Sequence, residues 1–253
     1  MMNFFSWLRL CVRGLLPDAC RLCRSPLAWP DAEMKGDMLA SFFCPYCIKE
    51  LLLLTSPLCR VCGLPLPSAW DDHVCGSCLE SPPAFRMARA PCLYEGKLVD
   101  IIHRFKYRGR TELALPLARL MAQSFRQHDF VLPHRVLPVP MTKKRIRQRG
   151  FNQAGLLARA LMEESGWKKG VGPVLDTRHL IRLHHTQSQT GLGREARKAN
   201  VKDAFGVTDG FEGEHLLLVD DVFTTGATVG ACARVLRAAG ALSVSVLTAG
   251  HRP

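Results

Sequence analysis

The chain has 253 residues, which is enough for one domain of ordinary size and a smaller one. Apolar residues make up 47% of the sequence, so a sizeable core can form and simple disorder is excluded. Lysine and arginine total 34 against 22 acidic residues, a net charge of +12. This excess favours an anionic partner, whether a phosphorylated small molecule, a nucleic acid or a membrane surface.

Residues 1–17 predict an amphipathic N-terminal segment with a short helix over residues 3–16. We expect its apolar face to pack on the protein itself, and a membrane or partner contact is the alternative. That face carries Phe4, Trp7, Leu8, Cys11 and Leu15. Two arginines interrupt the apolar run and no small-residue cleavage site follows, unlike a secretory signal peptide. The sequence contains no run of 18 apolar residues, so no membrane span is predicted. We expect a cytoplasmic protein. Thiols stay reduced in the cytoplasm, and cysteine clusters there indicate metal binding.

Eight of the 11 cysteines form four C-x2-C pairs before residue 79. The pairs are Cys20/Cys23, Cys44/Cys47, Cys59/Cys62 and Cys75/Cys78. Two thiolates separated by two residues can reach one ion from a tight turn, and structural zinc takes four such ligands. Residues 18–83 therefore predict a double zinc ribbon with two closed sites. We expect the first two pairs to share one ion and the last two pairs the other, while a crossed arrangement stays open.

A redox-active pair or an iron–sulfur cluster is the alternative for these cysteines. A thioredoxin-like pair lies at a helix N-terminus after a strand, whereas these pairs are expected in loops. Structural zinc is therefore the favoured interpretation.

Residues 84–253 have a different character, in which strands alternate with helices. Helices are expected at 97–107, 111–126, 152–164 and 226–239, and strands at 135–139, 215–219 and 242–248. This alternation predicts an α/β fold built on a parallel sheet with flanking helices.

The most informative stretch is residues 216–228, LLLVDDVFTTGAT, in which an apolar strand is followed by two acids and a threonine–glycine turn into a helix. A helix N-terminus at the carboxyl end of a parallel strand suits a phosphate. The adjacent carboxylates can accept hydrogen bonds from vicinal hydroxyls or hold Mg²⁺. Together these groups describe a site for a ribose 5-phosphate. Its candidate residues are Asp220, Asp221, Thr224, Thr225, Gly226, Ala227 and Thr228.

These thirteen residues resemble the phosphoribosyl-pyrophosphate (PRPP) signature of type I phosphoribosyltransferases. The resemblance implies a fold of that type, with the acids on the ribose hydroxyls and the threonine–glycine loop on the 5-phosphate. It also implies that PRPP binds together with Mg²⁺.

A basic segment follows the expected strand at 135–139, and it could neutralise a pyrophosphate; a solvated basic loop is the alternative. Its cations are Lys143, Lys144, Arg145, Arg147 and Arg149. A polar stretch, 184–205, could close over a ligand, with Arg194 and Arg197 as donors. With Asp220 and Asp221, these two arginines complete the candidate catalytic residues.

A third basic patch interleaves cations with an aromatic ring, which suits single-stranded nucleic acid. It comprises Arg104, Lys106, Tyr107, Arg108 and Arg110. The end of an amphipathic helix is an equally good interpretation of this patch.

Several motifs together resemble the ComF family, and most closely its GntX-like members. They are CRVCGLP at 59–65, FKYRGR at 105–110, VPMTKKRIRQRGFNQ at 139–153, TQSQTGLGREARKANVKDAF at 186–205 and the PRPP signature. The resemblance implies a part in handling imported DNA, in natural competence or in the use of DNA as a nutrient. It also implies that 186–205 corresponds to the flexible catalytic loop of amidophosphoribosyltransferases.

Two functions follow, and they are not exclusive. The first is a phosphoribosyltransferase that uses PRPP and an acceptor that the sequence does not identify. The second is a zinc-ribbon accessory protein for single-stranded DNA, whose transferase domain senses PRPP or serves as a scaffold. A weaker third hypothesis makes the ribbons a docking module for a helicase-like partner in DNA import.

Overall fold

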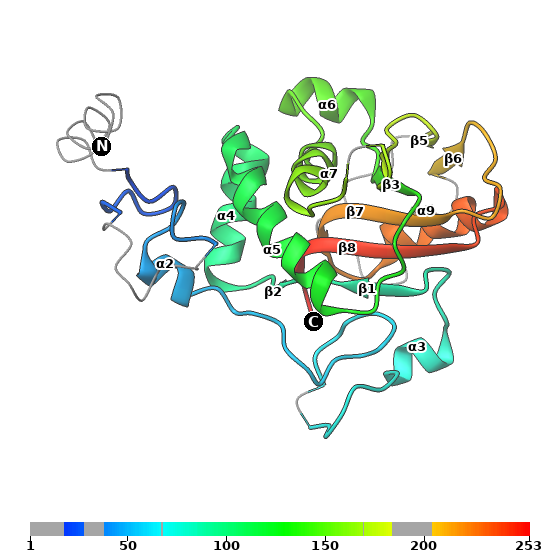
Figure 1. The fold of residues 1–253 in the computed structure, drawn as a ribbon, viewed down its shortest axis with the longest axis horizontal. Coiled ribbons are helices and arrows are strands. Elements are labelled where there is room, and N and C mark those ends of the chain that lie inside the picture. The colour runs from blue at the N-terminus through cyan, green and yellow to red at the C-terminus, as the bar shows by residue number, and fades with distance from the viewer. Residues whose placement is uncertain (1–17, 28–37, 67, 169, 184–203) are drawn as a thin grey trace. The chain divides into compact units, whose positions relative to one another are not determined.

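The computed structural model describes residues 18–27, 38–66, 68–168, 170–183 and 204–253 (Figure 1). The N-terminal helix expected over residues 3–16 lies outside these ranges. Contacts divide the chain into two compact units, residues 1–51 and 52–253. The first unit contains the first two cysteine pairs, and the second contains the other two pairs together with the sheet.

In the first unit, two short segments bring the cysteine pairs together. Residues 19 and 26 form an isolated antiparallel bridge around the first pair, where the Cys20 N–H donates to the Ser25 carbonyl at 2.8 Å. The second pair lies at the start of helix α2 (Pro45–Lys49), with Cys44 as its N-cap. The expectation of a loop is therefore wrong for this pair, because Pro45 at the first helical position favours a helix start.

The second unit is built on a six-stranded parallel sheet in the described part of the chain. The strand order is β1-β8-β7-β3-β4, and β2 pairs with β8 beyond β1. The strands are β1 (Met87–Arg89), β2 (Cys92–Leu93), β3 (Arg135–Pro138), β4 (Val174–Leu175), β7 (His215–Phe223) and β8 (Ser243–His251). The predicted parallel α/β fold is confirmed. A separate antiparallel pair consists of β5 (Leu180–Arg182) and β6 (Phe205–Val207).

The second unit also contains helices (Figure 1). They are α3 (Gly76–Glu80), α4 (Gly96–Tyr107), the 3-10 turn η2 (Thr111–Leu113), α5 (Ala114–Gln127), α6 (Lys143–Arg149), α7 (Gln153–Glu164) and α9 (Ala227–Ala238). The basic segment was not expected to be helical, but α6 has both ends defined. The Thr142 side chain accepts from the Arg145 N–H at 3.3 Å, and Gly150 ends the helix at φ +85°. Among the described residues, no helix has the length and apolar character needed to span a membrane.

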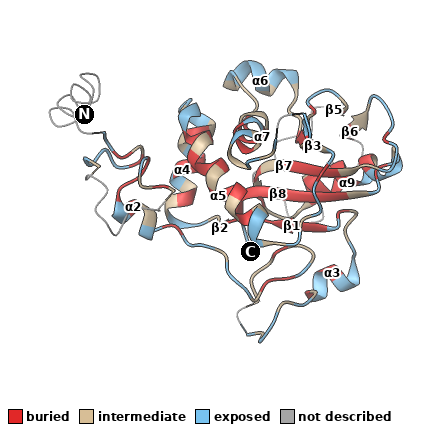
Figure 2. Cartoon of the chain, viewed as in Figure 1, coloured by how far each residue is buried: buried red, intermediate tan, exposed pale blue. Residues whose placement is uncertain are grey.

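Central strands β7 and β8 are buried along nearly their whole length (Figure 2). Leu216 and Leu218 of β7 share a core cluster with Cys232 and Leu236 of α9. Because side chains alternate along a strand, the intervening β7 residues point to the other face, and α7 contacts β7. Such continuous apolar strands are typical of parallel sheets covered on both faces. This core holds the carboxyl end of β7 in place.

The last two cysteine pairs form a small ribbon that packs on the edge of this sheet. The Ala88 N–H of β1 donates to the Val61 carbonyl at 2.7 Å. The Arg89 guanidinium is 5% exposed and donates to the carbonyls of Cys59 and Arg60, both at 3.2 Å. By contacts, residues 52–83 belong to the same compact unit as the sheet.

Candidate functional site

The acid pair lies near the carboxyl end of β7, within the strand. Strand β7 was expected to end at Val219, but its pairing with β8 continues to Phe223↔His251. Asp220 therefore pairs in register with Thr248, and Asp221 is 8% exposed. Burial and the neighbouring charge of Asp221 raise the pKa of Asp220 to about 7. The two carboxyl groups thus differ in environment although they are adjacent in sequence.

Lys106 supplies the positive charge of this site. Its Nζ lies 2.6 Å from Asp221 Oδ1, and the two side chains are 19% and 12% exposed. Burial is the largest single influence and would lower the pKa of Lys106, but the charge and hydrogen bond of Asp221, together with the charge of Asp220, raise this pKa overall. The positive charge of Lys106 also acts on Asp220, where it partly offsets the rise in pKa caused by burial and by Asp221. From the sequence, Lys106 was predicted to belong to a nucleic-acid patch, because nothing in the local sequence shows that α4 faces the end of β7.

The loop after β7 has the backbone geometry of a phosphate cradle. Gly226 is the N-cap of α9 at φ +70°, and a Cβ at this position would lie 2.7 Å from Cζ of Phe223. Thr225 Oγ1 accepts from the Ala227 N–H at 3.4 Å. The first amides of a helix have no intrahelical acceptor and carry a partial positive charge, so this turn can bind an anionic group. Thr224, Thr225 and Thr228 are partly exposed and can add hydroxyl donors.

Helix α6 presents its cations to solvent, since none of its residues is buried. It follows β3, whose last residue, Pro138, pairs with Val219 of β7 directly before the acid pair. Burial is the main cause of a lowered pKa at Arg182, and the charge of Arg145 lowers this pKa further. The charge of Arg182 in turn partly offsets the rise in the pKa of Asp220. Arg145 and Asp220 therefore lie within electrostatic reach of Arg182. Sequence reasoning missed Arg182, because it stands alone on a short strand.

The other residues of the third patch lie near the end of α4, and they do not form one uniform surface. Tyr107 is 62% exposed, packs against the His103 ring at 4.8 Å and lies under the Arg149 guanidinium at 4.9 Å. Arg108 is exposed, while Arg110 pairs with Glu112. The structure thus joins the end of α4 to the end of α6 at Tyr107.

The candidate closing loop, with Arg194 and Arg197, lies outside the described residues. The strands β5 and β6 that flank this stretch pair antiparallel, and the Leu183 N–H donates to the Ala204 carbonyl at 2.9 Å. The two ends of the stretch are therefore adjacent.

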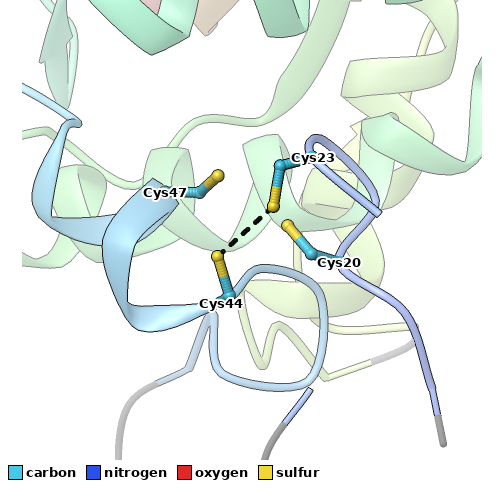
Figure 3. A group of neighbouring side chains, drawn as sticks. All are labelled: Cys20, Cys23, Cys44 and Cys47. Carbon is cyan, nitrogen blue, oxygen red and sulfur yellow. Dashed lines mark hydrogen bonds between the residues drawn. The ribbon is translucent and has the colours of Figure 1, made fainter. Parts of the chain in front are cut away.

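The eight cysteines form two clusters, and each holds its four sulfur atoms within 4.8 Å of one another. Figure 3 shows the four thiols of the first cluster converging from two segments. Both clusters group sequential pairs, so a crossed arrangement is excluded. The clusters are Cys20, Cys23, Cys44 and Cys47, and Cys59, Cys62, Cys75 and Cys78.

The sulfur spacing of both clusters fits a tetrahedral zinc site. Zinc–sulfur bonds of about 2.3 Å give a sulfur–sulfur edge of about 3.8 Å. The Cys23–Cys44 and Cys62–Cys75 sulfur atoms are 3.5 and 3.7 Å apart. Burial alone would raise the pKa of Cys59, but the N–H groups of Cys75 and Cys62, at 3.3 and 3.4 Å from its sulfur, help to lower it to about 6. A thiolate favoured in this way is a good metal ligand.

The comparisons with known proteins agree with this organisation. The family model for the double zinc ribbon domain matches residues 11–79. With the parallel sheet, the chain is a ribbon-bearing α/β protein. The DNA utilization protein YhgH of Salmonella typhimurium LT2 is 34% identical over 91% of this chain and 96% of the relative.

More distant relatives extend the family. Competence protein F of Haemophilus influenzae is 30% identical over 97% of both chains, and competence protein ComFC of Bacillus subtilis is 30% identical over 81% of this chain and 82% of the relative. The chain therefore belongs to the ComF family of DNA utilization and competence proteins.

Solved structures similar to this chain include phosphoribosyltransferases. The glutamine PRPP amidotransferase of B. subtilis is 20% identical over 57% of this chain and 30% of the other, with a TM-score of 0.34. A hypoxanthine phosphoribosyltransferase of Staphylococcus aureus is 13% identical over 55% of this chain and 62% of the other, with a TM-score of 0.33. At these TM-scores the similarity says nothing about the site.

Proposed function

We propose that residues 52–253 bind PRPP, or another ribose 5-phosphate, and that the protein acts in handling imported DNA in the cytoplasm. The observation that carries the proposal is the arrangement at the end of β7, where the acid pair directly precedes the phosphate cradle. The names of the relatives support the role in DNA utilization or competence.

The chemistry of the site suits this ligand at each point. The carboxylates of Asp220 and Asp221 accept hydrogen bonds from the ribose 2- and 3-hydroxyls, and the turn at Gly226 receives the 5-phosphate. Lys106 balances the charge of the acid pair, so that an anionic ligand is not repelled. Arg145 and the other α6 cations are suited to the pyrophosphate, and Mg²⁺, when bound with PRPP, would neutralise that group further.

Turnover would need an acceptor for the phosphoribosyl group. Transfer of the phosphoribosyl group would rest on orientation and on charge stabilisation of the leaving pyrophosphate. Arg194 and Arg197 are our candidates for closing the site during such a reaction.

A second function, binding of single-stranded DNA, is favoured by the surface around Tyr107. An exposed aromatic ring beside Arg149 and Arg108 suits base stacking next to backbone phosphates. Such binding should weaken steeply as the salt concentration rises. An import helicase remains a candidate partner of the ribbons.

Calorimetric titration of the zinc-loaded full chain with PRPP and Mg²⁺ tests the first function. Binding by the wild type and its loss in Asp220→Ala/Asp221→Ala would support a PRPP site. Lys168→Met, at an exposed lysine outside the site, is the matched control and should bind normally. If the folded wild type binds no PRPP while single-stranded DNA binds, the sheet is a scaffold and the second function stands.

A further inference from the structure

The phosphate cradle has a hollow on the side of the second cysteine cluster. A cavity of about 580 Å³ is lined by Cys62 and Cys75 on one side and by Thr224, Thr225 and Gly226 on the other. Phe223 and His251, at the ends of β7 and β8, also line this cavity.

His251, the last residue of β8, contacts the cysteine cluster. Its ring is 2% exposed, and Nε2 lies 3.1 Å from the Cys62 carbonyl oxygen. A carbonyl can only accept, so the proton must be on Nε2.

Phe223, the last residue of β7, connects His251 to the loop. The two rings are stacked with centroids 4.7 Å apart and planes 15° apart. The Phe223 ring lies directly beneath Gly226, where no Cβ could be accommodated. The Arg252 N–H also donates to the Phe223 carbonyl at 2.8 Å, and Phe85 packs edge-on against the Phe223 ring at 6.0 Å.

On the cluster side, the turn that carries Cys62 is held firmly against the sheet. Gly63 has φ +72°, and a Cβ there would lie 2.6 Å from the Ala88 carbonyl oxygen of β1. Arg89 bonds the carbonyl of Cys59 in the same turn. Displacement of this turn would therefore reach the His251 ring through the Cys62 carbonyl.

We propose that His251 and Phe223 are positioning residues that transmit the support of the second cysteine cluster to the phosphate cradle. The ribbon on the sheet thereby holds the turn at Gly226 in its anion-binding shape. The proposal rests on the proposed function only for what the cradle binds. This link explains why the ribbon, which contributes no residue to the acid pair, contacts the carboxyl end of β8.

The test is His251→Leu, which removes the bond to Cys62 and the flat ring but fills similar space. Hydrogen exchange measured by mass spectrometry should show amides of residues 224–228 exchanging about tenfold faster, because local opening is favoured. Amides of α7 serve as an internal reference and should not change. His215→Leu, at the start of β7 where the ring bonds Ser243, is the matched control and should leave the loop protected.

Ribose 5-phosphate binding, measured by calorimetry, is the second readout. Affinity should fall about tenfold in His251→Leu while metal analysis still finds the wild-type zinc content. Unchanged exchange at 224–228 in folded His251→Leu would overturn the proposal. If wild type binds no ribose 5-phosphate, only the proposed function fails, since the exchange test needs no ligand.

A second variant covers the case in which His251→Leu does not fold. Phe223→Leu breaks the same link from the loop side and should give the same faster exchange. Chelation of zinc from the wild type should also accelerate exchange at 224–228, and a loop that stays protected in the metal-free protein would contradict the proposal.

Discussion

Replacement of Lys106 by methionine tests the electrostatic design of the acid pair. The Lys106–Asp221 ion pair spans 2.6 Å with side chains 19% and 12% exposed, so it is mostly buried. Exposed pairs contribute at most about 1 kcal/mol, whereas removal of one partner from a fully buried pair costs about 3–5 kcal/mol. For this intermediate burial, we expect Lys106→Met to lower the free energy of unfolding by about 2 kcal/mol.

Urea denaturation of the zinc-loaded protein, followed by circular dichroism, measures this loss. Lys168→Met removes an exposed lysine and should leave the midpoint unchanged. Lys106 also lowers the pKa of Asp220, so its loss should move the pH midpoint of ligand binding above about 7. Equal stability of the two variants, together with an unmoved pH midpoint, would refute the assignment of Lys106 as the counter-ion of the pair.

Two further predictions concern the acid pair and the core. The folded-state pKa of Asp220 is raised to about 7, so its contribution to stability is complete below about pH 4, the usual value for aspartate, and is lost as the pH rises to about 7. Asp220→Asn should therefore flatten the pH dependence of urea stability between pH 4 and 7, and an unchanged profile would contradict this pKa. Phe105 is fully buried on α4, and Phe105→Ala should cost about 3–5 kcal/mol in the same urea assay. A loss below 1 kcal/mol would show that α4 does not depend on this ring.

Local patterns in the sequence were sufficient for the main elements of the fold. The apolar run before Asp220 predicted a buried strand, and the glycine at 226 marked the start of a helix that the structure places at Ala227–Ala238. Both signals depend on neighbouring residues, because burial on two faces needs a continuous apolar strand and a left-handed turn favours glycine. The four C-x2-C pairs predicted the cysteine clusters, because the two thiols of each pair are also close in sequence.

Helix α6 has no amphipathic periodicity that the sequence could show. A helix whose residues are all at least partly exposed has no apolar face, so its caps at Thr142 and Gly150 were the only signals in the sequence. A segment with five cations in seven residues therefore resembled a solvated loop.

The sequence alone determined which side chains are present: two sets of cysteines spaced for a metal ion, an acid pair and a threonine–glycine turn at a helix start. Tertiary structure decided which groups meet. Lys106 reaches Asp221 across 115 residues of sequence, and His251 reaches the Cys62 carbonyl across 189. The physical reason is that a parallel sheet gathers the carboxyl ends of strands distant in sequence at one edge, and no local pattern encodes which side chains lie there.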